Sequence, residues 1–520
     1  NLKSADDRLA LREIARDSAE LVAKYRGALS GEHGDGRVRA EFIPLMVGNE
    51  VYELFRRVKA LWDPTGLFNP GKIVDPQPMD TDLRYEEAQK PFAFDTFLDF
   101  SSDGDMLRAA ERCNGSGDCR KLPFTGASMC PSYQATRREQ DTTRARANVL
   151  REVMTRPLRP DKPLVDEAAA EVLDLCLSCK ACKRECPSNV DMALLKAETM
   201  YRIGKEHGFT RSAKFFASFA SNASRAVPLT KTLNTLLRLK PFSRLFKRVY
   251  GIAPERSIPA FSTRRASSAI ARYCAADDWD FLLYLDEFTE FQDAHVAESA
   301  AAFFHALGYR FGAVYAPSGR PAMSKGMLEQ AARAVRHLVA RTEVAVHKDL
   351  PVIGLEPSAV LGMRDDLPKL LRGAEAESAR RLGAAAMTFE EFVAREMREG
   401  RIGKEVFVGG SRRVHLHTHC HQKSLSHVKW GVEALSFPSG YRVDTIPSGC
   451  CGMAGSFGYE KDHYALSMKI GEMVLFPWVR KLGADDVVVT SGTSCRHQIA
   501  DGTGRRALHP AEVLWSALKK

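Results

Sequence analysis

Long apolar runs are missing from this sequence. No stretch approaches the roughly eighteen apolar residues that cross a bilayer, so we expect no membrane-spanning helix. An initiating methionine is missing too: the chain starts at Asn1, which indicates processing or a fragment, with any targeting signal in the missing part. Acidic residues are nearly missing from residues 209–272, where thirteen lysines and arginines accompany only Glu255.

The composition is that of a globular protein. The 520 residues are 44% hydrophobic and 27% charged, and that length allows three or four domains. The net charge is +10, yet residues 209–272 alone carry +12, so the remainder is close to −2. This uneven distribution argues against nucleic-acid binding by the whole protein and indicates a local basic surface instead.

The twelve cysteines are clustered. Seven lie between Cys113 and Cys186, four lie between Cys420 and Cys495, and Cys274 stands alone. Clustered spacing in a large chain favours metal or redox chemistry over a disulfide framework. It also indicates a reducing compartment, so we expect a cytoplasmic location.

Residues 176–188 read CLSCKACKRECPS, which is the bacterial ferredoxin spacing C-x2-C-x2-C-x3-C-P. Cys176, Cys179 and Cys182 can surround one cubane, while Pro187 turns Cys186 towards a second cluster. Zinc is the alternative, but four tetrahedral ligands do not come from so tight a run. The spacing therefore predicts iron–sulfur binding.

A second, altered motif lies upstream in RCNGSGDCRKLPFTGASMCPSY. Cys113 and Cys119 span the ferredoxin interval with Ser116 between them, and Cys130 precedes a proline. Cross-over between the motifs predicts one site made of Cys130 with Cys176, Cys179 and Cys182, and another made of Cys186 with Cys113 and Cys119. The second site lacks a fourth cysteine. It could be completed by Ser116 or by another ligand, or it could hold a three-iron cluster. The remaining alternative is a single working cluster, with the second motif a non-functional remnant. The flanking sequences DEAAAEVLDLC and DMALLKAETMYRIGKE predict helices.

The basic segment LTKTLNTLLRLKPFSRLFKRVYGI places leucines at helical intervals and is interrupted by Pro241. Such a basic amphipathic helix can lie on an anionic membrane surface. It can equally pack on its own protein and leave its basic face in solvent.

The C-terminal part contains an internal repeat. The segment APSGRPAMSKG from Ala316 resembles IPSGCCGMAGSFG from Ile446, and VIGLEPSAV from Val352 resembles VVVTSGTSCRH from Val487. Earlier in each copy, FLLYLDEFTEF corresponds to VHLHTHCHQK. Apolar strand-like runs alternate with helical stretches in both copies, which predicts two similar α/β units.

Cysteines remain only in the second copy, as Cys420, Cys450, Cys451 and Cys495; the first copy has Arg320, Pro321 and Ala359 at the matching places. Thiols that follow strands suit the functional edge of an open α/β sheet. They predict a further cluster or a redox-active thiol pair, with Gly449 and Gly452 letting the backbone approach a cluster. His417, His419 and His421 are candidates for ligands, proton carriers or plain surface residues.

The N-terminal segment SGEHGDGRVRAEFIPLMVG presents Glu32 beside His33 in a glycine-rich turn. A carboxylate beside an imidazole suits metal binding or proton abstraction, although a structured turn explains the pattern equally.

Two resemblances add to these observations. The cysteine-bearing residues 280–515 resemble the CCG domain of heterodisulfide reductase and of the iron–sulfur subunits of glycolate oxidase and anaerobic glycerol-3-phosphate dehydrogenase. The GEHGDG run and the ending DPTGLFNPGKI resemble the FAD-linked oxidase domain of D-2-hydroxyacid dehydrogenases. The order of parts resembles the bacterial fusion of that flavoprotein with ferredoxin and CCG domains, of the D-2-hydroxyglutarate dehydrogenase type.

The resemblance implies roles for particular residues. Glu32 would help to hold a divalent metal such as Zn or Mn, His33 would act as the base, and Asn69 and Lys72 would lie near the flavin pocket. FAD would be bound mainly by a missing N-terminal part, because no pyrophosphate loop is present. This chain has one cysteine-bearing copy where those relatives often have two, which leaves a special non-cubane cluster in doubt.

We therefore expect a multidomain α+β protein. Its N-terminal part would consist of the end of an FAD-linked oxidase domain (residues 1–75), a linker (76–105) and a helical ferredoxin-like domain (106–205). A basic helical connector (206–272), a CCG-like repeat without cysteines (273–400) and a CCG domain with cysteines (401–520) would follow. The expected function is FAD- and [4Fe–4S]-dependent oxidation of a 2-hydroxy acid such as D-2-hydroxyglutarate, D-lactate or glycolate. One or two such clusters would pass electrons to a quinone or redox protein, with peripheral contact to the inner face of the membrane. The alternatives are a stand-alone electron-transfer subunit and a thiol–disulfide reductase using Cys450 and Cys451.

Overall fold

The computed structural model describes residues 2–85 and 94–519, and the chain divides into two compact units. The N-terminal unit comprises Asn1–Ala93 and the C-terminal unit comprises Phe94–Lys520. Part of the predicted linker at residues 76–105 lies outside the described residues. The finer domain boundaries stay predictions.

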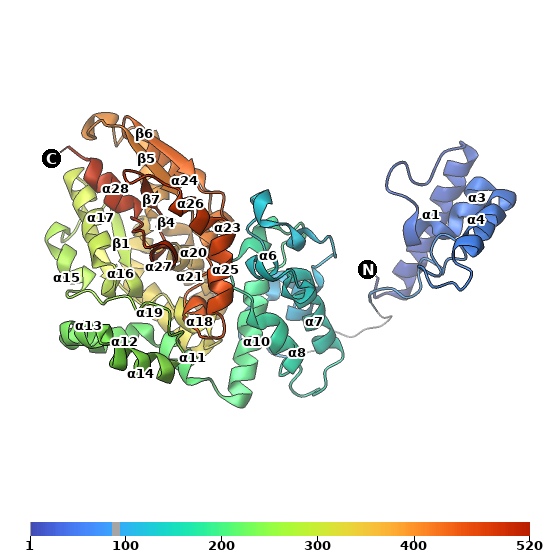
Figure 1. The fold of residues 1–520 in the computed structure, drawn as a ribbon, viewed down its shortest axis with the longest axis horizontal. Helices are drawn as coiled ribbons and strands as arrows, with labels where there is room; N and C mark the ends of the chain where they lie inside the picture. Colours follow the sequence, from blue (N-terminus) through green and yellow to red (C-terminus); the bar gives the residue numbers. More distant parts are fainter. Residues whose placement is uncertain (1, 86–93, 520) are drawn as a thin grey trace. The chain divides into compact units, whose positions relative to one another are not determined.

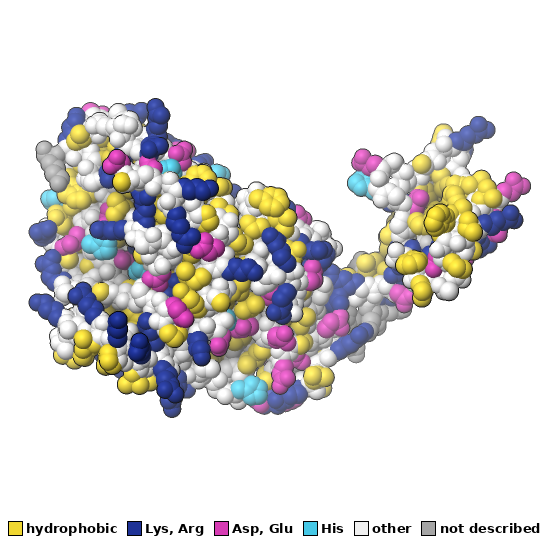
Figure 2. Space-filling view, in the orientation of Figure 1, with side chains coloured by type: hydrophobic (Ala, Val, Ile, Leu, Met, Phe, Trp, Pro, Cys, Tyr) yellow, Lys and Arg dark blue, Asp and Glu magenta, His cyan; other side chains and the backbone are white. Residues whose placement is uncertain are grey.

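The N-terminal unit is a small helical assembly (Figure 1). Its helices are α1 (Ala5–Lys24), α2 (Gly36–Arg39), α3 (Ile43–Val47) and α4 (Asn49–Trp62). Two small buried groups hold it together, one around Ala19 and Phe42 and the other around Ile43 and Tyr52. Most of its large apolar side chains remain exposed, as the yellow atoms over α1 and α4 in Figure 2 illustrate.

The C-terminal unit begins with a helical region around the first cysteines. Its helices are α5 (Met106–Glu111), α6 (Pro131–Thr136), α7 (Thr143–Thr155), α8 (Glu167–Asp174), α9 (Ala181–Glu185) and α10 (Met192–His207). The predicted helices on both sides of the cysteine run are confirmed. Asp166 and Asp191 cap α8 and α10 by accepting hydrogen bonds from backbone N–H groups that would otherwise lack partners.

The basic connector folds into α11 (Arg211–Ala217), α12 (Phe219–Ala226), α13 (Thr230–Arg238) and α14 (Lys240–Tyr250). Pro241 lies in the first turn of α14, where its missing N–H costs nothing, so the predicted interruption is confirmed. One face of α13 and α14 points inward, while Leu239, Leu245 and Val249 stay exposed among basic side chains.

A parallel sheet follows, with strand order β2-β1-β3-β4. Its strands are β1 (Phe281–Leu285), β2 (Phe311–Tyr315), β3 (Val352–Gly354) and β4 (Ala386–Thr388). Its helices are α15 (Ala266–Ile270), α16 (Glu287–Phe291), α17 (Ala294–Ala306), α18 (Arg320–Ser324), α19 (Leu328–His347), α20 (Pro357–Arg364), α21 (Gly373–Ala385) and α22 (Phe389–Arg398). Every residue of β1 is buried, as expected for a central parallel strand.

The second sheet has the order β6-β5-β7, which repeats the order β2-β1-β3 of the first. Its strands are β5 (Arg412–Leu416), β6 (Tyr441–Thr445) and β7 (Val487–Val489). Its helices are α23 (Cys420–Leu425), α24 (Lys429–Ser436), α25 (Tyr464–Met473), α26 (Leu475–Arg480), α27 (Thr493–Thr503) and α28 (Pro510–Ala517). The Pro-Ser-Gly echo follows β2 in the first sheet and β6 in the second, at equivalent positions.

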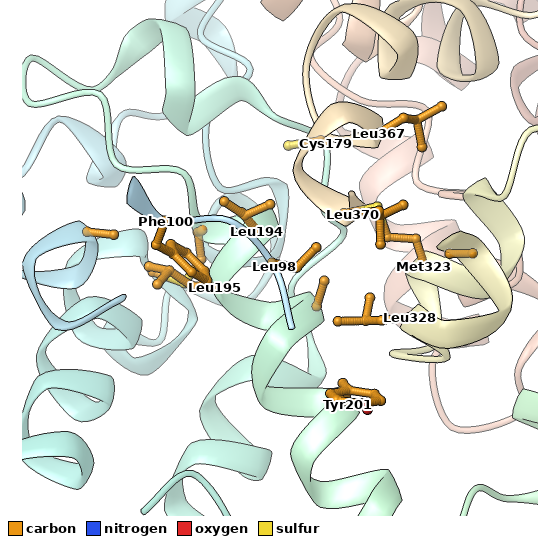
Figure 3. Close-up of a cluster of buried hydrophobic side chains, with 14 of the residues drawn as sticks. Leu98, Phe100, Cys179, Leu194, Leu195, Tyr201, Met323, Leu328, Leu367 and Leu370 are labelled. Carbon is orange, nitrogen blue, oxygen red and sulfur yellow. The ribbon is translucent and has the colours of Figure 1, made fainter. Parts of the chain in front are cut away.

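One apolar core joins the helical region to the first sheet. Figure 3 shows Leu98, Leu194 and Tyr201 facing Leu328 and Leu370 across this contact. The helices of the first sheet therefore support the cysteine-bearing region directly. Among residues 2–85 and 94–519, no helix has the length and apolar character needed to span a bilayer.

Candidate metal centres

The ferredoxin run folds as a turn, a short helix and a proline stop. Cys176 follows α8, Cys179 precedes α9, Cys182 lies within it and Cys186 ends it. Ser178 and Lys180, on either side of Cys179, have φ angles of 51° and 63°. Such left-handed conformations cost about 1–3 kcal/mol each in residues other than glycine, and they gather at functional sites. The backbone strain therefore marks this turn as a built site.

The upstream motif shows the same feature at Cys130, whose φ is 53° directly before Pro131. Its Sγ accepts a hydrogen bond from the Thr143 backbone N at 3.1 Å, at the start of α7. Cys113 and Cys119 are buried, whereas Ser116 between them is exposed. Ser116 is thus exposed between two buried cysteines, and its ligation of a cluster stays one of the open alternatives.

A carboxylate ties the two motifs together. Glu185, beside Cys186, accepts hydrogen bonds from the backbone N of Ser128 and Met129 at 2.9 and 3.0 Å, just before Cys130. All seven cysteines take part in one buried cluster, with Cys176 packed on its edge. We call them the first thiol centre: Cys113, Cys119, Cys130, Cys176, Cys179, Cys182 and Cys186. Which of them share an iron–sulfur cluster stays a prediction.

The chemistry of this centre suits a metal cluster. Burial raises the pKa of Cys130 to about 12, although the Arg146 guanidinium works against it. Buried thiols of this kind become thiolates when a metal supplies the compensating positive charge. Backbone N–H groups aimed at sulfur, as at Thr143, are the contacts that tune iron–sulfur potentials.

The four cysteines between Cys420 and Cys495 meet at the carboxyl end of the second sheet. Cys420 starts α23 after β5, Cys450 and Cys451 lie in the loop after β6, and Cys495 lies in the first turn of α27 after β7. Since β5 is the central strand, its two neighbours connect on opposite sides of it. That is the topological switch point at which open α/β sheets form their binding crevice.

These four residues form the second thiol centre. Cys450 lies within hydrogen-bonding reach of both Cys420 and Cys451, and Cys451 lies within reach of Cys495. The hydrogen bond to Cys450, together with burial, raises the pKa of Cys420 well above its usual value. The adjacent thiols Cys450 and Cys451 are both free. Four contiguous buried sulfurs from three loops make a suitable ligand set for soft metal ions.

His417 adds a nitrogen donor to this centre. Its ring is fully buried, and the ligand atoms of His417, Cys451 and Cys495 all lie within 4.8 Å of one another. The Nδ1 atom pairs with Ser448 Oγ at 2.7 Å, while the buried Nε2 atom has no hydrogen-bond partner among the described residues. A buried polar atom without a partner is costly, and a metal ligated by Nε2 would remove that cost.

His419 and His421 are buried as well, so the expectation that some of these histidines lie at the surface is wrong. The Arg320 guanidinium, which only donates, contacts His421 Nε2 at 3.2 Å. The neutral ring therefore carries its proton on Nδ1, which faces Cys420 Sγ at 3.6 Å. Burial first, and then Arg320, holds the pKa of His421 well below its ordinary value.

The loop between β6 and α25 is held from both sides. Lys423 Nζ donates to the carbonyls of Ser448 and Gly449, which fixes the approach to Cys450. A Cβ at Gly449 would meet the Ala127 carbonyl at 3.2 Å, and one at Gly452 would meet the Ser467 carbonyl at 2.3 Å. These glycines thus allow contact with neighbouring backbone, a role different from the predicted approach to a cluster.

The two thiol centres are neighbours. Ser424 Oγ, on α23, donates to the Cys179 carbonyl at 3.3 Å, and Cys420 and Cys450 raise the pKa of Cys179 further after burial. Leu177 and Cys450 share one buried apolar group. The structure therefore places the ferredoxin turn directly against the thiols of the second sheet.

The matching places of the first sheet hold other chemistry. Arg320 pairs with Asp366, and Ala359 is buried within α20. Lys180, from the ferredoxin turn, lies 2.9 Å from Asp365 and 3.0 Å from Asp366. The first sheet thus uses ion pairs to hold the cysteine turn in place.

The N-terminal unit presents its candidate residues in solvent. Glu32 and His33 are about 85% and 84% exposed, and Glu32 Oε1 lies 3.3 Å from His33 Nε2. Asn69 and Lys72 are also exposed. Within the described part of this unit, no third acidic, thiol or imidazole ligand joins the pair. The structure does not bring these four residues together into a closed site.

Family comparisons agree with the arrangement of the thiols. Residues 112–191 match the 4Fe-4S dicluster domain. Residues 1–73 match the C-terminal domain of FAD linked oxidases. The resemblance to FAD-linked oxidases and the ferredoxin-type cysteine spacing are thereby confirmed, and with them the association of this chain with FAD and [4Fe–4S] chemistry.

Curated relatives cover nearly all of this chain. D-2-hydroxyglutarate dehydrogenase of Escherichia coli (strain K12) is 25% identical over 98% of this chain and 53% of its own length. The Pseudomonas putida protein of the same name is 26% identical over 97% of this chain and 52% of its own length. A subunit of the anaerobic glycerol-3-phosphate dehydrogenase of Escherichia coli (strain K12) is 26% identical over 57% of this chain and 74% of its own length. The chain spans about half the length of the D-2-hydroxyglutarate dehydrogenases that it matches.

Several residues of these centres escaped the sequence analysis. Glu185, Lys423 and Lys180 stand among many other charged residues, and only the fold shows that each is turned inward. The burial of His417 and His419 had one available signal, because they alternate with His415 along a strand and its extension.

Proposed function

We propose that this chain is the electron-exporting part of an FAD-linked 2-hydroxyacid dehydrogenase, with D-2-hydroxyglutarate, D-lactate or glycolate as the substrate class. The observation that carries the proposal is the set of largely buried thiols from Cys113 to Cys495 within one compact unit, in a chain whose other unit matches the flavin-linked oxidases. The names of the relatives support the same chemistry.

The first thiol centre would hold two clusters. Cys130, Cys176, Cys179 and Cys182 would bind one, and Cys113, Cys119 and Cys186 would bind the other with a ligand still to be identified. When bound, such clusters accept and release single electrons. The protein's own contribution is burial, the Thr143 N–H directed at sulfur and the Glu185 bridge that fixes the distance between the two motifs.

The second sheet would be a CCG-type domain with a further cluster, and the first sheet its thiol-free repeat. Their shared strand order supports this assignment. The ligands would be Cys420, Cys450, Cys451 and Cys495, with His417 as an additional donor. The contact of this centre with the Cys179 turn supports the proposal that electrons pass through it last, before they reach the acceptor.

The N-terminal unit would complete a flavin-linked active site. Its exposed apolar side chains, among them Leu54, Phe55, Leu61 and Trp62, form a surface that the rest of such an oxidase fold would cover. There His33 would take the hydroxyl proton, Glu32 would help to bind a divalent metal such as Zn or Mn, and Asn69 and Lys72 would lie near FAD.

The basic, partly apolar face of α13 and α14 supports peripheral contact with an anionic membrane.

A second candidate is an iron–sulfur subunit without a substrate site of its own. The match to the anaerobic glycerol-3-phosphate dehydrogenase protein favours it, because the aligned region includes 74% of that relative. The N-terminal unit argues for the dehydrogenase, because an electron-transfer subunit has no need of an oxidase-type ending.

Reduction of the cofactors by substrate under anaerobic conditions tests the proposal in the enzyme that contains this chain and its FAD-binding part. We expect a D-2-hydroxy acid to bleach the flavin and then the broad iron–sulfur absorbance, and we expect His33→Ala to abolish both changes. Flavin bleaching with permanently oxidised clusters would contradict the role of this chain in electron export.

A further inference from the structure

A cavity of about 270 Å³ adjoins the second thiol centre and is unused by the function proposed so far. The connector helices wall it with Phe215, Phe216, Phe219, Leu233, Leu237 and Phe246. At its inner end lie Cys420, Cys450 and Cys451. The cavity therefore joins an apolar, aromatic chamber to the thiols.

The inner end lies between the two sheets. Arg320 and Pro321 of the first sheet line it, and these are the residues that replace the Cys450–Cys451 pair in the repeat. Glu356 and Ser358, at the start of α20, line it as well. The loss of thiols from the first repeat thus leaves a chamber with sulfur on one side and polar, charged groups on the other.

This lining selects a particular kind of ligand. Aromatic and aliphatic walls favour a flat apolar ring, while the Arg320 guanidinium, with five N–H donors, can donate a hydrogen bond to a carbonyl oxygen. The volume suits one small ring system. Cys450 and Cys451 are only 5% and 4% exposed, so direct contact of these sulfurs with a partner protein is disfavoured, whereas a small molecule in the cavity would lie beside them.

The helices that wall the cavity also suit a ligand that dissolves in lipid. Leu233, Leu237 and Phe246 face inward, while Leu239, between the two helices, and Leu245, on α14, are 53% and 61% exposed. Exposed basic side chains surround them, as the dark blue groups on this part of Figure 2 illustrate. Apolar and basic groups together favour contact with an anionic bilayer, where such ligands reside.

We propose that this cavity binds a quinone, which accepts the electrons that the hydroxy acid releases. The inference rests on the proposed function and adds the class of the acceptor and its binding site. Oxidation of the C–OH group to C=O releases two electrons and two protons. The quinone takes up two electrons and two protons from solvent, and its two C=O groups become C–OH groups.

Binding of heptyl-hydroxyquinoline N-oxide, a fluorescent quinone analogue, to the 520-residue chain tests the inference without any turnover. We expect saturable, one-to-one quenching of its fluorescence. Ala223, which is 3% exposed on α12 and lines the cavity, provides the blocking variant. Ala223→Phe is expected to weaken binding at least tenfold, and Ala226→Phe, on the same wall, to weaken it in the same direction.

Ala374→Phe is the matched control, because Ala374 is exposed at the start of α21 and lies outside the cavity lining. It should bind the analogue as the parent chain does. Iron and acid-labile sulfide are measured on each preparation, so that misfolding is seen separately. Absence of quenching, or equal binding by both lining variants and the parent, would overturn the inference. If iron is present in that case, the proposed electron transfer survives and a different acceptor is indicated; if iron is absent while the analogue binds, it is the proposed function that fails.

Discussion

The two parallel sheets of the C-terminal unit have one strand order and two chemistries. In the first, the start of α18, which follows β2, carries Arg320 and Pro321, and the helix after β3 carries Ala359. In the second, the corresponding places carry Cys450, Cys451 and Cys495. The comparison shows that the scaffold tolerates both sets, and that the carboxyl edge of the sheet is where the difference lies. The first sheet anchors the ferredoxin turn through ion pairs with Lys180, and the second sheet gathers four buried thiols.

The largest effect should come from removing one thiol of the second sheet and comparing it with its counterpart in the first. Cys495→Ser is expected to abolish metal binding at the second thiol centre, because a soft cluster loses a buried ligand. Ala359→Ser adds the same side chain at the equivalent place and should leave the metal content unchanged. Metal analysis of anaerobically purified protein checks both variants. Equal metal content in the two would remove the distinction between the sheets.

The supporting role of the first sheet predicts a large loss of stability at Lys180. Its ammonium lies 2.9 Å from Asp191, 2.9 Å from Asp365 and 3.0 Å from Asp366, and its side chain is fully buried. Lys180→Met removes the buried ammonium that all three carboxylates share, and leaves Lys183 beside Asp365 and Arg320 beside Asp366 as the remaining cations. We expect a loss of about 3–5 kcal/mol in the free energy of unfolding.

Lys205→Met provides the control for that loss. Lys205 pairs with Glu329 at 3.1 Å, but both side chains are about half exposed. The expected loss is below about 1 kcal/mol. Denaturant titrations of the two variants with the parent chain measure the difference, and similar losses would mean that the buried ion cluster does not anchor the cysteine turn.

His417 sharpens the comparison further, because the first sheet has no buried imidazole with an unpaired nitrogen among the residues described there. His417→Ala is expected to weaken metal retention at the second thiol centre by about 10–100-fold. Competition with a chelator measures the change. His337→Ala, at an exposed histidine on α19, is the control. Unchanged retention would assign His417 to packing alone.

The smallest expected effect concerns pH. Burial lowers the pKa of His463, but hydrogen bonds to Asp174 and Glu460, both at 3.0 Å, more than offset it and raise the pKa to about 9. Because the folded pKa lies above the ordinary value of about 6.5, the stabilisation is complete below that value and is lost as the pH rises through 9.

His463→Gln should therefore lower the free energy of unfolding by about 1–2 kcal/mol in mildly acidic solution and have little effect in strongly alkaline solution. Thermal unfolding across this range measures the difference, with His337→Gln as the control. A difference that does not change with pH would show that His463 links α25 to α8 without its charge.

The sequence predicted the cysteine motifs, the helices beside them and the repeat, because each has a local signal. Cysteine spacing, acidic caps and the Pro-Ser-Gly echo can be read from neighbouring residues. The relation between the thiol centres could not be predicted in this way. Contact of the Cys179 turn with Cys420 and Cys450 depends on how α9 packs against α23, and no local pattern records that packing. Glu32 and His33 show the opposite case: their local motif is clear in the sequence, but both side chains are exposed and form no closed site in the N-terminal unit.

Quantitation of iron and acid-labile sulfide in the anaerobically purified chain, together with electron paramagnetic resonance, tests the central claim most directly. Two cubanes at the first thiol centre predict about eight irons and an equal amount of sulfide per chain, and a higher value would include the second thiol centre. A colourless protein with stoichiometric zinc and no sulfide would contradict the account.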